Sequence, residues 1–173
     1  MKILLYPDPA LRKKAEPIRE ITEEVRQKAE EMVELMYEAE GIGLAATQVG
    51  WPVKLLVKDA PAESTGGRIF INPVITHREG ETLEEEGCLS LPGVFGKIPR
   101  AERVAVVAYN LQGERLEIDA EGVAARVWQH EIDHFSGILI LDKMTPASSM
   151  ASARRLKEME ADYRERAAGS RIL

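Results

Sequence analysis

The sequence predicts an α+β fold in which antiparallel β-sheets surround a central α-helix, with further helices near the N-terminal and C-terminal ends. Three observations indicate this fold. Residues 22–40 have apolar positions at helical spacing, residues 53–120 contain several short strand-like segments, and residues 123–135 are apolar on nearly every helical face. With 173 residues, of which 45% are hydrophobic and 30% charged, we expect one domain over residues 1–173.

The N-terminal part is predicted to be extended over residues 1–15, apart from one helical turn around Ala10-Leu11-Arg12. The helix over 22–40 is amphipathic and ends at Gly41. Its apolar positions, three and four residues apart, are Val25, Ala29, Met32, Val33 and Met36. The next stretch, residues 41–50, either caps this helix and continues as a buried strand or uses its glycines to approach a ligand closely.

The middle of the chain predicts strands separated by turns. The predicted strands are residues 53–57, residues 68–72 ending at Asn72-Pro73, two strands within 74–86 paired around Arg78-Glu79-Gly80, residues 104–109 and residues 116–120. Residues 61–67 are predicted to be a loop, and residues 111–114 a turn. His77 has no partner at ligand spacing, so we expect a surface histidine.

The C-terminal part begins with a short apolar segment, residues 138–141, which is predicted to be extended after Gly137. A last helix is predicted over about 147–167, with Ser148 or Ser149 as its N-cap. Residues 147–173 carry six basic and four acidic side chains, a net charge of +2 against -8 for the remainder.

Composition excludes several classes of protein. The net charge of -6 argues against DNA binding through a basic surface, and no apolar run reaches the ~20 residues of a transmembrane helix. The N-terminal segment lacks the features of a signal peptide. The single cysteine, Cys88, excludes an internal disulfide and fits a reducing compartment, so a cytoplasmic protein without membrane contact is expected.

The predicted central helix carries the motif His130-Glu131-x-x-His134. Two imidazoles at i and i+4 lie on one face of a helix and can bind one metal ion. Glu131 points elsewhere around the helix, which suits a general base acting on a metal-activated water. The alternative is a pair of core histidines, but two buried rings would then need two other polar partners.

The third ligand distinguishes the possible enzyme classes. The metzincin pattern fails because Ile140 occupies the position of its third histidine. A thermolysin-like peptidase takes a downstream glutamate, and Glu158, with Asp162 one turn later, is the candidate. Cys88 is the other option, since a Cys/His/His set leaves one position open, as in catalytic sites. By itself, however, a lone cysteine is ordinarily a small buried hydrophobic residue.

Three blocks of the sequence resemble the peptide deformylases. They are Gly41-Ile42-Gly43-Leu44-Ala45-Ala46-Thr47-Gln48, Glu86-Gly87-Cys88-Leu89-Ser90 and Gln129-His130-Glu131-Ile132-Asp133-His134. Thr47 replaces a common proline, Phe135 a common leucine, and an arginine found in some members after the Cys block is absent around Phe95. The resemblance implies removal of the formyl group from N-formylmethionine of nascent polypeptides, with formate released.

The resemblance also implies the roles of individual residues. Cys88, His130 and His134 bind Fe²⁺, for which Zn²⁺, Ni²⁺ or Co²⁺ can substitute. Glu131 is the general acid and base, and the Gln48 side chain and the Leu89 backbone N–H are donors to the oxyanion. In a deformylase-like protein that only binds ribosomes or nascent chains, Cys88, Glu131 and Gln48 would not be required.

The formylmethionyl side chain is expected to enter an apolar pocket. Its candidate residues are Ile42, Gly43, Leu44, Val123 and Val127, with Leu89 and His130 alongside and Gly43 pairing with the peptide backbone. Arg126 lies near this wall, either at the pocket mouth or directed outward. Glu86 and Arg100 are expected to form an ion pair, and Asp133 to orient neighbours rather than bind metal. The C-terminal helix either contacts the ribosome or is a solvated packing helix.

Overall fold

The computed structural model describes residues 1–59 and 68–169, and the predicted loop 61–67 lies outside these ranges. The helices and strands are α1 (Glu23–Glu38), β1 (Gly43–Ala45), β2 (Leu55–Lys58), β3 (Ile69–Glu79), β4 (Thr82–Gly87), β5 (Phe95–Arg100), β6 (Arg103–Tyr109), β7 (Arg115–Glu121), α2 (Gly122–His134) and α3 (Pro146–Gly169). Short 3₁₀ turns occupy Pro9–Arg12, Ala46–Val49 and Ile140–Asp142. No helix among the described residues is long and apolar enough to span a membrane.

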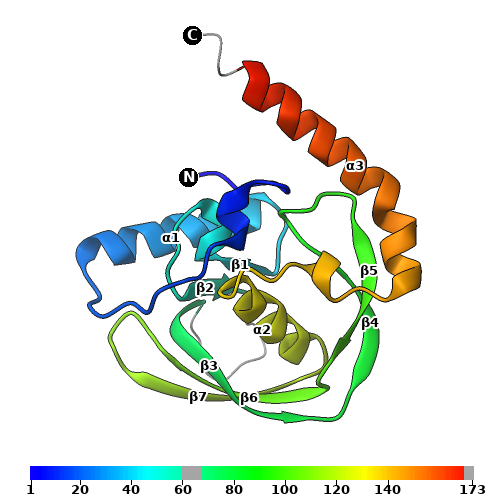
Figure 1. Cartoon of the computed structure of the whole chain (residues 1–173). Coiled ribbons are helices and arrows are strands. Elements are labelled where there is room, and N and C mark those ends of the chain that lie inside the picture. Colours follow the sequence, from blue (N-terminus) through cyan, green and yellow to red (C-terminus); the bar gives the residue numbers. More distant parts are fainter. Residues whose placement is uncertain (60–67, 170–173) are drawn as a thin grey trace.

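The strands form two antiparallel sheets around α2 (Figure 1). One sheet has five strands in the order β1-β2-β3-β6-β7, and the other pairs β4 with β5. The α2 helix packs on the larger sheet through Ala125 and Trp128, and the Trp128 ring meets Phe70 edge-to-face at 4.7 Å between centroids. The predicted α+β fold, with antiparallel sheets about a central helix, is therefore confirmed.

The N-terminal elements follow the predicted pattern. The turn at Pro9–Arg12 is present, and Thr22 caps α1 by accepting a hydrogen bond from the Val25 N–H at 3.3 Å. Ala29, Met32 and Met36, spaced three and four residues apart, are fully buried against the sheet. The polar residues between them face solvent, as an amphipathic surface helix requires.

The predicted pairing in the middle of the chain is wrong. A single strand, β3, continues through Asn72-Pro73 to Glu79, and it pairs with β2 and β6 instead of with β4. The strand continues past the proline because its pairing register with β6 shifts there, where Asn72 has a φ of 49°. The Asn72 side chain accepts a hydrogen bond from the Ile18 N–H at 2.9 Å and donates one to the Ile18 carbonyl at 2.7 Å. Both neighbours of β3 are then occupied, so β4 pairs with β5.

The strand β5 was not predicted from the sequence. It alternates exposed and buried residues and pairs with β4 along its whole length, from Gly87↔Phe95 to Thr82↔Arg100. The sequence does not predict this strand because it contains Gly96 and Pro99, and both residue types are unfavourable inside strands. Gly96 is required here because a Cβ atom would lie 2.7 Å from the Met144 side chain.

The C-terminal elements need two corrections. Ile140–Asp142 forms a 3₁₀ turn instead of continuing the predicted extended segment. The helix α3 begins at Pro146, and Thr145 caps it by accepting from the Ser148 N–H at 3.3 Å, so neither Ser148 nor Ser149 is the N-cap. Ser148 instead accepts a hydrogen bond from the Lys97 N–H at 2.9 Å, which fixes the start of α3 on β5.

Candidate metal centre

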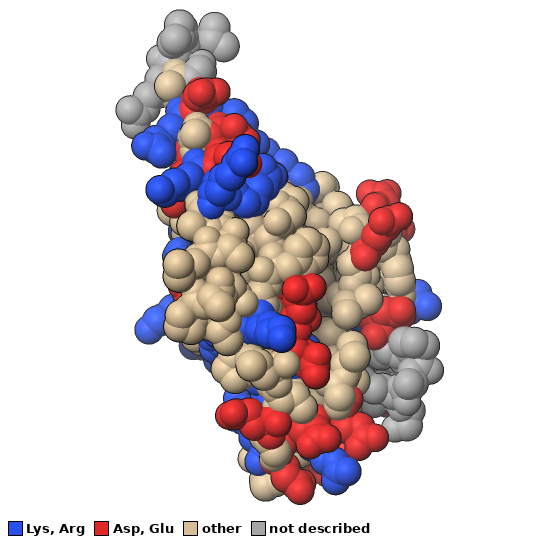
Figure 2. Space-filling model, turned by 90° about the vertical axis from the view of Figure 1, so that its right-hand side faces the viewer, with Lys and Arg blue, Asp and Glu red and all other residues tan. Residues whose placement is uncertain are grey.

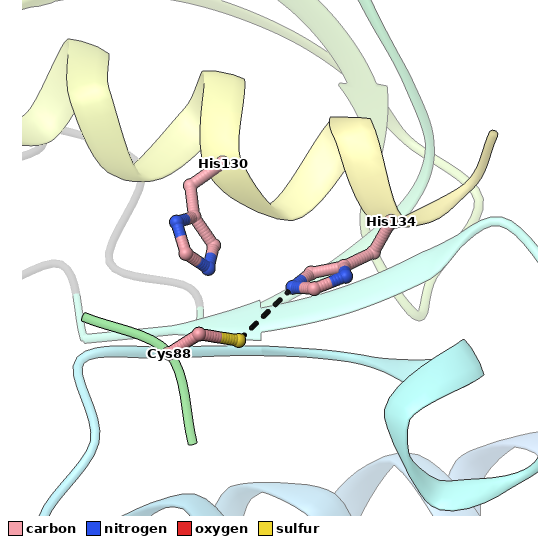
Figure 3. Close-up of side chains that lie close together, drawn as sticks. All are labelled: Cys88, His130 and His134. Carbon is pink, nitrogen blue, oxygen red and sulfur yellow. Dashed lines mark hydrogen bonds between the residues drawn. The ribbon is translucent and has the colours of Figure 1, made fainter. Parts of the chain in front are cut away.

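Three side chains from two separate segments meet beside α2. His130 and His134 project from one face of the helix, and Cys88 comes from the loop that follows β4 (Figure 3). Their potential ligand atoms lie within 4.8 Å of one another, and Cys88 Sγ is 3.6 Å from His134 Nε2. One thiolate and two imidazoles on one side of a common point fit a four-coordinate metal with one position left open.

The loop that carries Cys88 is held on both sides. Just before it, the Phe95 ring packs against Gly87 so closely that a Cβ atom at this position would lie 2.7 Å from the ring. After it, the Leu91 N–H donates to the Cys88 carbonyl at 2.9 Å, and the Tyr6 N–H donates to the Ser90 carbonyl at 2.9 Å. The thiol is therefore placed by backbone contacts within and outside the loop.

His130 is oriented by a group of buried charged side chains, which we call the Glu86 cluster. Its members are Glu86, Arg100, Arg126, His130 and Asp133. Glu86 Oε2 lies 2.9 Å from His130 Nδ1. Burial opposes ionisation of Glu86, but hydrogen bonds from His130 and Arg100 and the Arg100 charge lower its pKa to about 2. An ionised carboxylate only accepts hydrogen bonds, so Nδ1 donates and Nε2 is left for the metal.

His134 is also prepared to bind a metal. Its side chain is buried, with 1% of the residue exposed. Burial is the main cause that lowers the pKa of His134 well below the ordinary value, and the charge of the neighbouring His130 is the next. The ring is consequently neutral near pH 7, which is the form that donates a nitrogen lone pair to a metal.

Glu131 is buried against Gly43 and lines the same cavity. The carboxylate leaves no room for a side chain at Gly43, where a Cβ would lie 2.5 Å from Glu131 Oε1. Its Oε2 atom has no hydrogen-bond partner among the described residues. Burial raises the pKa of Glu131 to about 7, so the group can both take up and release a proton near neutral pH.

Gln48 is fixed in the 3₁₀ turn beside the cluster of ligands. Its Oε1 accepts a hydrogen bond from the Ala45 N–H at 2.8 Å, which sets the orientation of the side-chain amide. Its Nε2 then points to Ser90 Oγ at 3.1 Å and to Cys88 Sγ at 3.4 Å. A fixed amide N–H beside the ligand atoms is suited to stabilise negative charge on a reacting oxygen.

A cavity of about 1180 Å³ opens beside the candidate metal centre, and the buried His134 is not among the residues that line it. Among the residues predicted for the site, those that line it are Ile42, Gly43, Gln48, Cys88, Leu89, Val123, Val127, His130 and Glu131. Ile42 and Val123 present large exposed apolar side chains, 54% and 71% exposed. Leu44 differs from the other predicted pocket residues, because its side chain is fully buried in the core with α1 and does not line the cavity.

The remaining sequence hypotheses are settled by position. His77 is exposed on β3, as predicted. Glu158 is wrong as a metal ligand, because it lies exposed on α3 and pairs with Arg154 at 3.0 Å. Asp133 forms ion pairs with Arg100 at 2.5 Å and Lys143 at 2.7 Å.

Sequence reasoning did not place Arg126, which is buried and paired with Glu86 at 2.8 Å. The predicted ion pair between Glu86 and Arg100 is present at 2.8 Å. The sequence did offer one sign that Arg126 is buried, because a basic residue stands there among apolar residues of the predicted central helix. Its partner on β4 could not be identified without the tertiary fold.

Comparison with known proteins gives one consistent result. A family model described as polypeptide deformylase matches residues 1–150. The peptide deformylase of Thermodesulfovibrio yellowstonii is 47% identical over 159 residues, covering 91% of this chain and 96% of the relative. That of Acidobacterium capsulatum is 46% identical over 163 residues, covering 91% and 94%.

Solved structures agree over nearly the whole chain. A peptide deformylase from Plasmodium falciparum superposes with a TM-score of 0.89 at 35% identity, covering 95% of this chain and 98% of that one. Peptide deformylase 1B of Arabidopsis thaliana, solved in complex with an inhibitor, gives 0.88 at 36% identity, with coverages of 96% and 93%.

Proposed function

Because the chain belongs to the polypeptide deformylase family, we propose that it hydrolyses the formyl group from N-formylmethionyl peptides at a metal held by Cys88, His130 and His134. The observation that carries this assignment is the convergence of one thiol and two imidazoles within 4.8 Å, two of which, Cys88 and His130, line the same cavity as Glu131. A divalent ion in such a set supplies Lewis-acid activation of water and of the formyl carbonyl.

The metal is proposed to be Fe²⁺. The choice of Fe²⁺ rests on the resemblance to the deformylases, because a thiolate with two imidazoles is a ligand set of intermediate softness that also accepts Zn²⁺, Ni²⁺ or Co²⁺. The protein contributes the geometry and an open position rather than a strong preference among these ions. Elemental analysis of protein purified without oxygen identifies the ion that is loaded.

Glu131 is proposed to move the proton in both halves of the reaction. Its unpartnered Oε2 is free to accept a proton from the attacking water, and the pKa of about 7 allows the same carboxyl to return it. The proton goes to the departing amine of the methionyl residue as the bond between the formyl carbon and that nitrogen breaks. The products are formate and a peptide with a free N-terminus.

Gln48 and the backbone N–H of Leu89 are proposed as donors to the oxyanion of the tetrahedral intermediate. Gln48 Nε2 is held beside Cys88, and Leu89 follows Cys88 directly and lines the cavity. Removing one donor of this kind typically lowers kcat about 10²- to 10³-fold.

The substrate peptide is proposed to lie along β1 with its methionyl side chain in the apolar cavity. Ile42, Val123 and Val127 provide the apolar walls. Gly43 and Leu44 contribute through the backbone of β1, which is an edge strand of the five-stranded sheet and can pair with an extended chain. A formyl group has only hydrogen on its carbon, so a narrow site at the metal would admit it and exclude larger acyl groups.

The surface of α3 is proposed to contact the ribosome near its exit tunnel. Figure 2 shows many Lys and Arg side chains, with Asp and Glu side chains among them, on the projecting part of the molecule formed by α3. Contacts between this helix and the rest of the molecule reach as far as Glu160. They include hydrogen bonds from Ser152 Oγ to the Phe95 carbonyl and from Tyr6 Oη to Glu160. Loss of ribosome co-sedimentation after deletion of residues 161–173, with formate release retained, is therefore the test.

We further propose that residues 1–173 act as one catalytic domain in the cytoplasm, where formylated nascent chains arise. The support is that the two relatives compared by sequence, from Acidobacterium capsulatum and Thermodesulfovibrio yellowstonii, are bacterial peptide deformylases whose alignments each cover 91% of the chain. No membrane or specific DNA contact is part of this function.

Formate release from formyl-Met-Ala-Ser tests the central proposal. The protein is prepared anaerobically with Fe²⁺, and wild type is compared with Cys88→Ala and with the matched control Glu158→Ala. We expect formate from wild type and Glu158→Ala and none from Cys88→Ala. An inactive wild type refutes the deformylase function, and activity that survives Cys88→Ala refutes the ligand set.

A further inference from the structure

The buried side chain of Arg126 donates hydrogen bonds to three different residues beside the cavity. It lies on α2 one helical turn before His130 and is 9% exposed. One guanidinium nitrogen, Nη1, donates to Glu86 Oε1 at 2.8 Å and to the Ile98 carbonyl at 2.9 Å. The other, Nη2, donates to Thr82 Oγ1 at 2.7 Å. A buried cation with this many directed bonds fixes the atoms that it contacts.

Glu86 is the partner that Arg126 shares with the metal centre. Arg100 holds the same carboxylate, from Nε to Oε1 at 2.8 Å and from Nη2 to Oε2 at 3.0 Å. His130 Nδ1 occupies the remaining direction on Oε2 at 2.9 Å. With both oxygens bonded on several sides, the carboxylate has a single position, and this position determines the plane of the imidazole.

The contacts of Arg126 also join the two segments that supply the ligands. The helix α2 carries His130, whereas β4 leads directly into Cys88. Arg126 reaches Thr82 at the first residue of β4 and Glu86 near its last. Its guanidinium therefore links the helix directly to both ends of the strand. Arg100, which lies on β5, makes a second link between the same elements through Glu86 and Asp133 but does not reach the start of β4 at Thr82.

We propose that Arg126 is a positioning residue for the metal centre, which holds Glu86 against His130 and sets the spacing between α2 and the Cys88 loop. The proposal rests on the metal-dependent function above, but its test does not require substrate. Removing a group that orients a metal ligand typically lowers metal affinity about 10- to 100-fold. Arg126 is expected near the lower figure, because Arg100 retains part of the orientation.

Zinc affinity, measured by competition with a chromophoric chelator, tests this role. The full-length protein is compared with Arg126→Met, Arg126→Lys and the control Arg115→Met, which removes an exposed arginine of β7 paired with Glu117. We expect the dissociation constant for Zn²⁺ to rise about tenfold in Arg126→Met and about threefold in Arg126→Lys, since lysine keeps the charge but cannot form the fork. Arg115→Met is expected to match wild type.

A second variant keeps the test decisive if Arg126→Met does not fold. Thr82→Val removes one hydrogen bond of Arg126 and no charge, and we expect about a threefold rise in the Zn²⁺ dissociation constant. The thiolate-to-metal absorption of the Co²⁺-loaded protein should change in Arg126→Met and in Thr82→Val. Unchanged affinity and an unchanged Co²⁺ spectrum, with only the unfolding temperature lowered, overturn the proposal. A wild type that binds Zn²⁺ but releases no formate refutes the proposed function and leaves this inference standing.

Discussion

The Glu86 cluster and the charged surface of α3 differ in how their ion pairs form: those of the cluster are buried and join residues far apart in the chain, whereas those of α3 are exposed and join near neighbours. Glu86 is 7% exposed, and its partners lie 14, 40 and 44 residues away in the chain. On α3, Arg154 pairs with Glu158 four residues later, and the two side chains are 93% and 46% exposed. Buried charges depend on partners from other elements because water cannot replace those partners, whereas surface charges on a helix need only their neighbours and solvent.

The difference indicates where function depends on exact placement. In the cluster, each carboxylate and guanidinium determines the position of the next, and the series of contacts ends at His130, a proposed metal ligand. On α3, loss of one charge leaves the others solvated and the backbone unaffected. Changes at the cavity should therefore have large effects, and equivalent changes on α3 small ones.

The largest expected effect is at Glu131, the proposed general acid and base. Glu131→Gln is expected to lower kcat for formate release about 10³-fold, because general acid–base catalysis typically contributes about 10²- to 10⁴-fold. Metal content should stay at the wild-type level, since Glu131 is not among the proposed ligands. Activity within tenfold of wild type in a fully metal-loaded variant contradicts the role of Glu131.

A large effect on stability is expected from Glu86→Gln, and it should depend on pH. Folding lowers the pKa of Glu86 from 4.5 to about 2. The ionised form therefore stabilises the fold fully above about pH 4.5, and this contribution, about 3 kcal/mol, disappears as the pH falls towards 2. Guanidinium unfolding in the presence of a chelator measures the difference between variant and wild type at each pH.

The matched control for this measurement is Glu84→Gln, on the same strand but exposed. We expect it to change the unfolding free energy by less than about 0.5 kcal/mol at every pH. A difference between Glu86→Gln and wild type that stays constant from pH 7 to pH 2 shows that ionisation of Glu86 does not stabilise the cluster.

A smaller loss is expected from adding a single methyl group at Gly43. In Gly43→Ala the Cβ would lie 2.5 Å from Glu131 Oε1, so the carboxylate must move. A displacement of about 1 Å at a reacting group can lower the rate about 10²-fold, and kcat for formate release measures it. Gly113→Ala, in a turn with a φ of 79°, is the control that costs about 1 kcal/mol of stability without lowering kcat. Equal activity in the two variants excludes close contact between Gly43 and Glu131.

The smallest effect is expected on α3. Glu158→Ala removes an exposed i,i+4 pair and should lower the unfolding free energy by about 0.3–0.5 kcal/mol. Because salt screens such pairs, the difference from wild type should vanish in about 1 M NaCl. A loss above about 2 kcal/mol means that α3 resembles the buried cluster and removes the contrast between the two regions.

Much of this protein was determined by local sequence patterns. The spacing of Ala29, Met32 and Met36 predicted α1, and the two histidines of α2 with Glu131 between them predicted a metal-binding helix with a nearby base. Such features follow from the period of the helix, which brings residues three and four positions apart onto one face wherever the helix lies. The single thiol then limited the choice of third ligand to Cys88 or an acidic residue.

Tertiary structure decided the rest. Strand pairing was mispredicted at β3 and β4, and β5 was missed, because pairing depends on which edges are free and not on the strand's own residues. The position of Leu44 in the core and the burial of Arg126 likewise depend on segments remote in the chain. The sequence therefore determined which residues are proposed to perform the chemistry, whereas the fold decided how Glu86 and its arginines are placed around His130. A buried charge is placed by whichever partners the packed elements bring to it.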